Sequence, residues 1–217
     1  MKNNTNQQKI NEKGVLDVLE SKVKLYKKQI ALTAGIVVLV AAAAGLISHL
    51  KNQAYQKQWG DLFLAELPIA AAQEGETPDL SQLEVYAAAN ESSQAGAYAA
   101  LTLGDAYYQQ KNYEKAEIYF KQAIKNGNKD LQAIAESSLI AVYVAQEAYA
   151  KAVEQADAFI AKNPGHFALA QVKTHKALAT ELSGKPQEAK ALYAEIIEQY
   201  PSSYSSALAE LQSSKIK

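Results

Sequence analysis

The sequence contains neither cysteine nor arginine. Without Cys, the 217-residue chain cannot form disulfides, thiolate metal sites or a cysteine nucleophile. All 22 basic residues are lysines, so no side chain offers the planar fork that reads guanine edges or clamps phosphate with two hydrogen bonds. We therefore expect no sequence-specific nucleic-acid binding, whereas the absence of Cys leaves the redox compartment open.

Residues suited to catalysis or metal binding are also sparse. The three histidines, His49, His166 and His175, lack the i, i+4 spacing that places two ligands on one helical face. No Ser stands in a Gly-x-Ser-x-Gly elbow, and Gly residues near Lys lack Walker spacing. We expect a noncatalytic protein, with no catalytic, metal-binding or cofactor-binding residues and no small-molecule substrate.

One long apolar run is present near the N-terminus, "QIALTAGIVVLVAAAAGLISHL", between Lys28 and Lys51. A helix over residues 30–48 just crosses the roughly 30 Å hydrocarbon core of a bilayer, whereas buried core helices seldom run so long without a polar stripe. A cleaved signal peptide is the alternative, because residues 41–44 are small alanines, but its basic n-region would be unusually long. The run predicts an uncleaved transmembrane helix at residues 29–50.

Lysine counts predict the orientation of this span. Five lysines closely precede it and only Lys51 and Lys57 closely follow it, so the N-terminus should be cytoplasmic and residues 51–217 exported. Residues 1–28 then form a basic cytoplasmic tail. Within it, Val15, Leu19, Val23 and Tyr26 predict an amphipathic helix, which either lies along the inner leaflet or extends the spanning helix.

The exported body contains a repeat. Ala116, Ala152 and Ala189 are separated by 36 and 37 residues, and each follows an apolar pattern of helical spacing. Pro164 and Pro201 cannot continue a helix and so mark the ends of the second and third units. These features resemble the tetratricopeptide repeat, a helix-turn-helix unit. We predict an all-α fold, with a single N-terminal transmembrane helix followed by a tetratricopeptide-like α-solenoid over residues 51–217.

Packing explains most of the residues that define the repeat. Gly104 and Ala177 are expected where two helix axes approach closely, and aromatic residues are expected to fill the space between pairs. The predicted packing residues are Gly104, Tyr107, Ala116, Phe120, Tyr143, Ala152, Ala189 and Tyr193.

Both ends of the repeat array carry helix signals. Thr77, Pro78 and Asp79 predict a helix start with Thr77 as N-cap and Pro78 in the first position. Residues 53–67 are expected to continue the membrane helix and to pair with residues 79–90. A last helix, in "SSYSSALAELQSSKIK", is expected to cap the open end of the array.

The first helix of a tetratricopeptide unit faces a concave groove, and its matching positions here are Tyr98, Leu101, Asp105 and Tyr108. A tyrosyl groove can hold an extended or helical apolar segment. Because the groove lacks a cluster of basic residues, an acidic C-terminal tail is a poor ligand. The alternative is that Tyr98 and Tyr108 only cover an adjacent helix.

The basic tail, the span near residue 40 and the divergent repeats together resemble the YfgM-like family, known as ancillary subunits of the SecYEG translocon. The resemblance implies a single-pass protein of the bacterial inner membrane with a periplasmic C-terminal domain. The partners it implies are translocon subunits, a membrane-bound periplasmic chaperone and exported clients. A scaffold for envelope assembly or cell division is the alternative function, and an enzyme is the third class.

Overall fold

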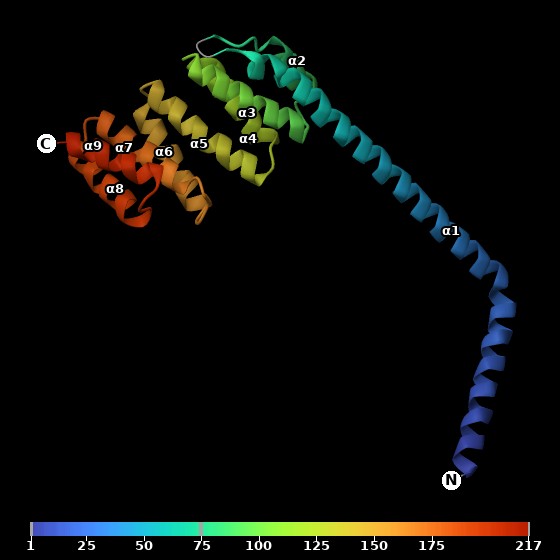
Figure 1. Ribbon diagram of the computed structural model, residues 1–217. Helices are drawn as coiled ribbons and strands as arrows, with labels where there is room; N and C mark the ends of the chain where they lie inside the picture. Colours follow the sequence, from blue (N-terminus) through green and yellow to red (C-terminus); the bar gives the residue numbers. More distant parts are fainter. Residues whose placement is uncertain (1, 74–75, 217) are drawn as a thin grey trace. The chain divides into compact units, whose positions relative to one another are not determined.

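The computed structural model describes residues 2–73 and 76–216, and these residues form helices and turns without a strand (Figure 1). The chain divides into two compact units, Met1–Lys57 and Gln58–Lys217. The helices are α1 (Lys2–Ala71), α2 (Ser81–Ala89), α3 (Gln94–Gln109), α4 (Tyr113–Asn126), α5 (Lys129–Ala145), α6 (Tyr149–Lys162), α7 (Leu169–Leu182), α8 (Pro186–Gln199) and α9 (Tyr204–Lys215).

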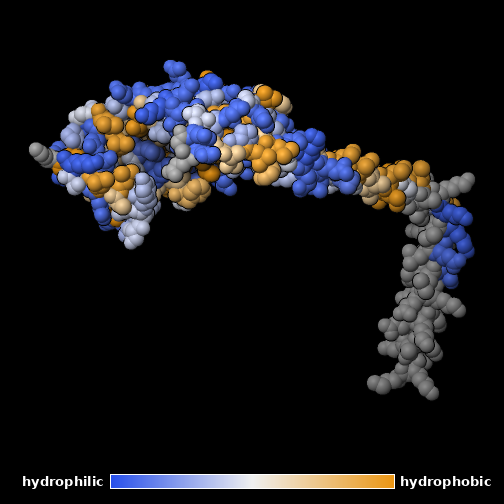
Figure 2. All heavy atoms as spheres, turned by 45° about the horizontal axis from the view of Figure 1, so that its top comes forward, coloured by the Kyte–Doolittle hydropathy of each residue, from blue (hydrophilic) through white to orange (hydrophobic). Residues whose placement is uncertain are grey.

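Helix α1 contains the candidate membrane span. The stretch Gly35–Ala71 includes an 18-residue window of mean hydropathy 1.6, none of which is buried in the protein. Large apolar side chains such as Val37 and Leu39 are about two-thirds exposed, and Figure 2 shows hydrophobic side chains along this part of the helix. A surface of this kind is what a bilayer would cover. The side chains of Val15, Leu19 and Val23 lie outside the described residues, so the amphipathic tail stays a prediction.

The second unit is a succession of helix pairs. Helices α3, α5 and α7 each pack against the helix that follows them, α4, α6 and α8. Helix α3 also contacts α5, α5 contacts α7, and α7 contacts α9. We call α3, α5 and α7 the A helices and α4, α6 and α8 the B helices. This pairing is the predicted all-α solenoid, and Pro164 and Pro201 stand two residues after the ends of α6 and α8.

The same turn joins each A helix to its B helix. Lys111, Glu147 and Gly184 have φ angles of 58°, 60° and 87°, in the left-handed region. Glycine adopts this region without steric cost, whereas Lys111 and Glu147 adopt it against their preference. In the first of these turns, the side-chain oxygen of Asn112 accepts a hydrogen bond from the backbone N–H of Lys115 at the start of α4. Asn128 caps α5 in the same way, in the connection from α4 to α5.

The start of α2 differs from the expected one. The helix begins at Ser81, with Leu80 in the N-cap position, rather than at Pro78. Leu80 is buried, so the chain inserts this side chain into the core before the helix starts. Asp79 accepts a hydrogen bond of 2.9 Å from the Ser81 N–H, and this bond lowers the pKa of the Asp79 carboxyl. Burial of Leu80 therefore had more influence on where α2 begins than the capping signals at Thr77 and Pro78.

The end of α1 belongs to the second unit, and it continues to Ala71 rather than stopping near Leu67. Its Leu62 is buried in the same core cluster as Leu83 of α2, and the Tyr86 hydroxyl donates a 2.7 Å hydrogen bond to the Gln58 carbonyl. The expected pairing of this segment with residues of α2 is therefore present. Its Pro68 is tolerated within the last turn of the helix.

At the other end, α9 closes the array. Ala209 and Ile216 are buried against Ala189, Tyr193 and Ile196 in a separate apolar cluster that also holds Ala177. Without α9 these side chains of α7 and α8 would be exposed to water, so the last helix caps the array as expected.

Candidate protein-binding surface

The predicted packing residues lie inside the repeats. All eight are buried, and their burial defines the spacing between A and B helices. A Cβ atom added to Gly104 would come within 2.6 Å of the Phe120 ring. The absence of a side chain at Gly104 is therefore what allows Phe120 of α4 to pack against α3.

The four predicted groove residues have different surroundings. Tyr98 and Tyr108 are 41% and 36% exposed, and Asp105 is also at the surface. Leu101, in contrast, is buried in the main core cluster and does not line an open surface. The prediction for Leu101 is corrected, because in α3 its position faces the interior.

Both tyrosines touch a neighbouring aromatic residue. The Tyr98 ring lies edge-on to Trp59 of α1, with ring centroids 5.8 Å apart, and Tyr108 lies 5.5 Å from Tyr113. Beside Tyr98, the Thr102 hydroxyl donates a 3.1 Å hydrogen bond to Glu66 of α1. The two tyrosines thus contact residues of adjacent helices and also keep part of their rings accessible.

Burial shifts the pKa of two ionisable groups on the A helices toward their neutral forms. Desolvation by surrounding atoms raises the pKa of the Asp105 carboxyl to about 6, although its residue is exposed overall. Desolvation also lowers the pKa of His175 on α7 to about 4, so this imidazole is neutral at pH 7. We call the exposed side of α3, which carries Tyr98, Asp105 and Tyr108, the A face. Asp105 is the one charged residue of α3.

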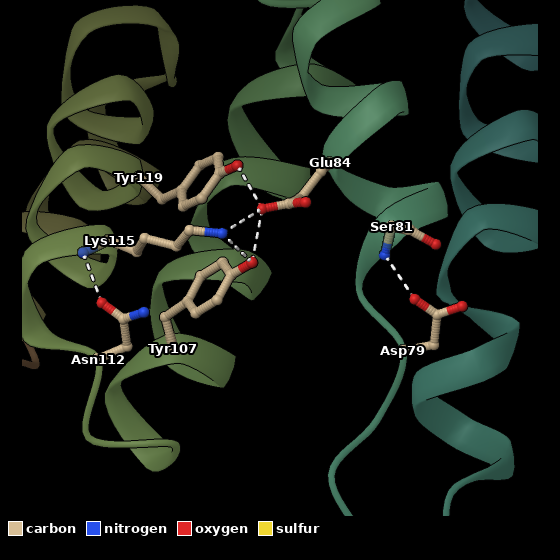
Figure 3. Close-up of polar contacts among 7 residues, drawn as sticks. All are labelled: Asp79, Ser81, Glu84, Tyr107, Asn112, Lys115 and Tyr119. Atoms are coloured by element: carbon tan, nitrogen blue, oxygen red, sulfur yellow. Dashed lines mark hydrogen bonds and ion pairs between the residues drawn. The ribbon is translucent and has the colours of Figure 1, made fainter.

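A polar cluster that the sequence did not predict joins α2, α3 and α4 (Figure 3). One oxygen of Glu84 accepts hydrogen bonds from the hydroxyls of Tyr107 and Tyr119, at 2.5 and 3.1 Å, and from the Lys115 ammonium at 3.1 Å. The two tyrosine rings stack with centroids 5.6 Å apart and an interplanar angle of 4°. The Tyr107 hydrogen bond is the main cause that lowers the pKa of Glu84, and burial is the main cause that raises the pKa of Tyr119 to about 12.

These contacts make the Glu84 cluster structural. One oxygen of its carboxylate accepts three hydrogen bonds, and side chains 31 to 35 positions apart meet there across the interface of α2 with α3 and α4. Among the residues that the structure describes, no group of three His, Cys, Asp or Glu side chains could hold a metal ion.

Two segments of the chain that form helix pairs also match models of a known repeat family. Residues 97–130 and residues 168–203 each match a family model described as a tetratricopeptide repeat. No curated protein matches the chain. Two solved structures are similar to it at 18% identity and a TM-score of 0.46, each over 55% of this chain. One is the second tetratricopeptide domain of human RPAP3 in complex with an HSP70 peptide, and the similarity covers 93% of that chain. The other is the Arabidopsis OM64 tetratricopeptide domain, and the similarity covers 94% of that chain.

The two family matches correspond to α3 with α4 and to α7 with α8. Helices α5 and α6 form the intervening pair. In the turn between them, Glu147 has a positive φ angle, as Lys111 and Gly184 have in the turns of the other two pairs. The chain therefore contains tetratricopeptide repeats, the helical unit of protein-interaction scaffolds.

Proposed function

We propose that this protein is a membrane-anchored, noncatalytic scaffold that binds other proteins through its repeats and assists secretion at the translocon exit, together with a periplasmic chaperone. In this proposal it is a single-pass protein of the bacterial inner membrane. Residues 1–28 are cytoplasmic, residues 29–50 span the bilayer and residues 51–217 are periplasmic. Translocon subunits, a membrane-bound chaperone and exported clients are its partners.

One observation carries the proposal: an apolar helix with no buried residue in its most hydrophobic window shares a chain with tetratricopeptide repeats. An anchor of this kind holds the repeats at the membrane surface. Tethering raises the local concentration of the scaffold near membrane-bound partners, so contacts of modest affinity suffice.

The A face is the surface proposed for these contacts. Tyr98 and Tyr108 present large, stiff aromatic rings whose ordering costs little conformational entropy. Asp105 is the one charged residue of α3, and burial raises the pKa of its carboxyl to about 6. Such a surface suits apolar segments of a partner or of an emerging chain. The assignment to secretion rests on the resemblance to the YfgM-like family.

The test is a crosslinked pull-down of the full-length protein from its native membrane, with partners identified by mass spectrometry. We expect translocon subunits and a periplasmic chaperone, and we expect their loss when residues 1–50 are deleted. Changing both Tyr98 and Tyr108 to Ala should reduce recovery several-fold, since exposed aromatic anchors dominate many interfaces. Tyr204→Ala is the matched control, because Tyr204 is 84% exposed on α9.

Two outcomes would contradict this proposal. Recovery of wall-synthesis or division proteins alone would replace secretion by envelope assembly or division. Unchanged recovery from the Tyr98→Ala, Tyr108→Ala double variant, with its helical circular dichroism intact, would remove the A face as the binding surface.

A further inference from the structure

A second surface involves two successive B helices and the A helix between them. A hollow of about 510 Å³ opens between α4, α5 and α6. Its floor includes Leu139, Tyr143 and Phe159, which are almost fully buried, and its lining residues include three lysines, Lys121, Lys151 and Lys162. We call it the α4–α6 hollow. Its volume falls within the roughly 300–1,000 Å³ of pockets that bind ligands.

The preceding repeat shows what occupies the equivalent space there. Tyr107 and Lys115 stand 36 residues before Tyr143 and Lys151, and both lysines lie over the tyrosine ring, at 4.4 and 3.9 Å from its centroid. In the earlier repeat the ring of Tyr119 stacks on Tyr107, and the carboxylate of Glu84 binds Lys115. An aromatic ring beside a carboxylate therefore fills this space (Figure 3).

The α4–α6 hollow keeps the tyrosine and the lysine but lacks the ring. The residue equivalent to Tyr119 is Gln155, whose side chain is exposed. In the next repeat, Leu192 stands at the corresponding position, and the hollow between α6, α7 and α8 has only about 140 Å³. Of the three equivalent B-helix residues, Tyr119, Gln155 and Leu192, Gln155 of the middle repeat is the one without a large aromatic or aliphatic side chain.

Charge at the rim is also unbalanced. Lys121 and Lys151 share one carboxylate oxygen of Glu117, at 2.7 and 3.4 Å, and Lys162 pairs with Glu136 at 2.6 Å. Three ammonium groups therefore face two carboxylates. In the smaller hollow, Lys173 and Lys176 pair with Glu195 and Asp157, so cations and anions are equal in number. The excess cation of the α4–α6 hollow favours a ligand with a negative charge.

We propose that the α4–α6 hollow is a second docking site, which binds a protein segment carrying an aromatic side chain next to a carboxylate. The ring would stack over Tyr143 where Tyr119 stacks over Tyr107, and the carboxylate would meet the lysines at the rim. The site is separate from the A face and does not depend on the role in secretion. A partner bound here would leave the A face accessible.

The test uses the full-length protein in lipid nanodiscs and a fluorescent probe peptide. The probe is a short alanine-based helix in which a Tyr precedes a Glu by one turn, so that ring and carboxylate lie on one face. Two further peptides carry Ala in place of the Tyr or Lys in place of the Glu. Fluorescence anisotropy should show binding of the probe, with an affinity that falls as salt rises, and much weaker binding of the other two.

Variants of the protein locate the binding. Gln155→Tyr should place a ring in the hollow and weaken probe binding by about tenfold or more. Changing Lys121 and Lys162 together to Gln should weaken it by roughly threefold to tenfold. The matched controls are Gln109→Tyr, an exposed position on α3, and Lys125→Gln, whose lysine does not line the hollow and pairs with Glu91. Neither control should change the affinity.

Three results would overturn the proposal: no binding of the probe, equal binding of the peptide with Lys, or an unchanged affinity in a folded Gln155→Tyr protein. If circular dichroism shows that Gln155→Tyr does not fold, the lysine variant decides in the same way. The Tyr98→Ala, Tyr108→Ala protein should still bind the probe, so failure of this site and failure of the A face are distinguishable.

Discussion

At the scale of single residues, small side chains determine how closely the helices of a pair approach. Ala116, Ala152 and Ala189 are fully buried at one position of successive B helices. Gly104 fills the corresponding role from an A helix, against Phe120. The cost of enlarging such a residue depends on whether its neighbour can move, and an aromatic ring held between two helices has little freedom.

Gly104→Ala tests this argument. The new methyl group would overlap the Phe120 ring, so we expect a loss of about 1–3 kcal/mol in the free energy of unfolding, measured by urea denaturation. Gly60→Ala is the matched control, because a Cβ at Gly60 would have nothing within 4 Å. That substitution should stabilise the helix by about 0.5–1 kcal/mol. Equal effects of the two changes would show that close approach at Gly104 does not limit packing.

At the scale of helices, the contacts that join one repeat to the next are polar as well as apolar. The Glu84 cluster connects α2 with α3 and α4 through a single carboxylate. Glu117 similarly connects α4 to α6 and to the end of α5, through Lys151 and Gln146. Hydrogen bonding and ion pairing of Glu117, first with Lys121, lower the pKa of this carboxyl to about 2. The lowered pKa of each carboxyl means that the folded protein favours its ionised form.

Glu84→Gln should therefore destabilise the protein in a pH-dependent way. The pKa of Glu84 is lower in the folded than in the unfolded state, so its stabilisation is present above the unfolded pKa and is lost as pH falls through the folded pKa. We expect a deficit of about 1–2 kcal/mol at pH 7 that shrinks toward pH 3, measured by chemical denaturation at each pH.

The control for this substitution is Glu91→Gln. Glu91 pairs with Lys125 at 3.4 Å, and both side chains are more than half exposed. An exposed pair of this kind contributes little, so the change should stay within about 0.5 kcal/mol at any pH. A deficit of Glu84→Gln that does not vary with pH would argue against the charged hydrogen bonds as its cause.

At the scale of the whole molecule, each repeat depends on its neighbours for burial. In such an array, stability is roughly the sum of local units and the interfaces between them. The C-terminal cluster of Ala177, Ala189, Tyr193 and Ile196 is covered by α9. Loss of this cover should loosen α7 and α8 before it affects the N-terminal pair of α3 and α4.

Two substitutions within α9 test this order. Ala209 is fully buried and Ala207 is exposed, so Ala209→Glu should displace the cap whereas Ala207→Glu should not. In Ala209→Glu, hydrogen exchange should become faster in α7 and α8 by about tenfold or more, with α3 and α4 nearly unchanged. Uniform acceleration across all helices would mean that the array unfolds as one cooperative unit.

Some features of this protein follow from the sequence by itself. The candidate membrane span is one of them, because a span needs a continuous apolar run, and the run from Ile30 to Leu50 is readable without coordinates. The repeat is likewise readable, because the spacing of Ala116, Ala152 and Ala189 and the prolines after α6 and α8 reflect helix geometry over short stretches of chain. These patterns are local, and local geometry repeats when the sequence repeats.

Other features were decided by the tertiary structure. Burial of Leu80 moved the start of α2 past Thr77 and Pro78, and burial of Leu101 removed it from the A face. The partners of Glu84 come from two other helices, and the α4–α6 hollow exists because Gln155 leaves a space that Tyr119 and Leu192 fill in neighbouring repeats. Such features depend on the volumes and charges of side chains that three different helices bring together. They cannot be predicted from the spacing of residues along any one helix.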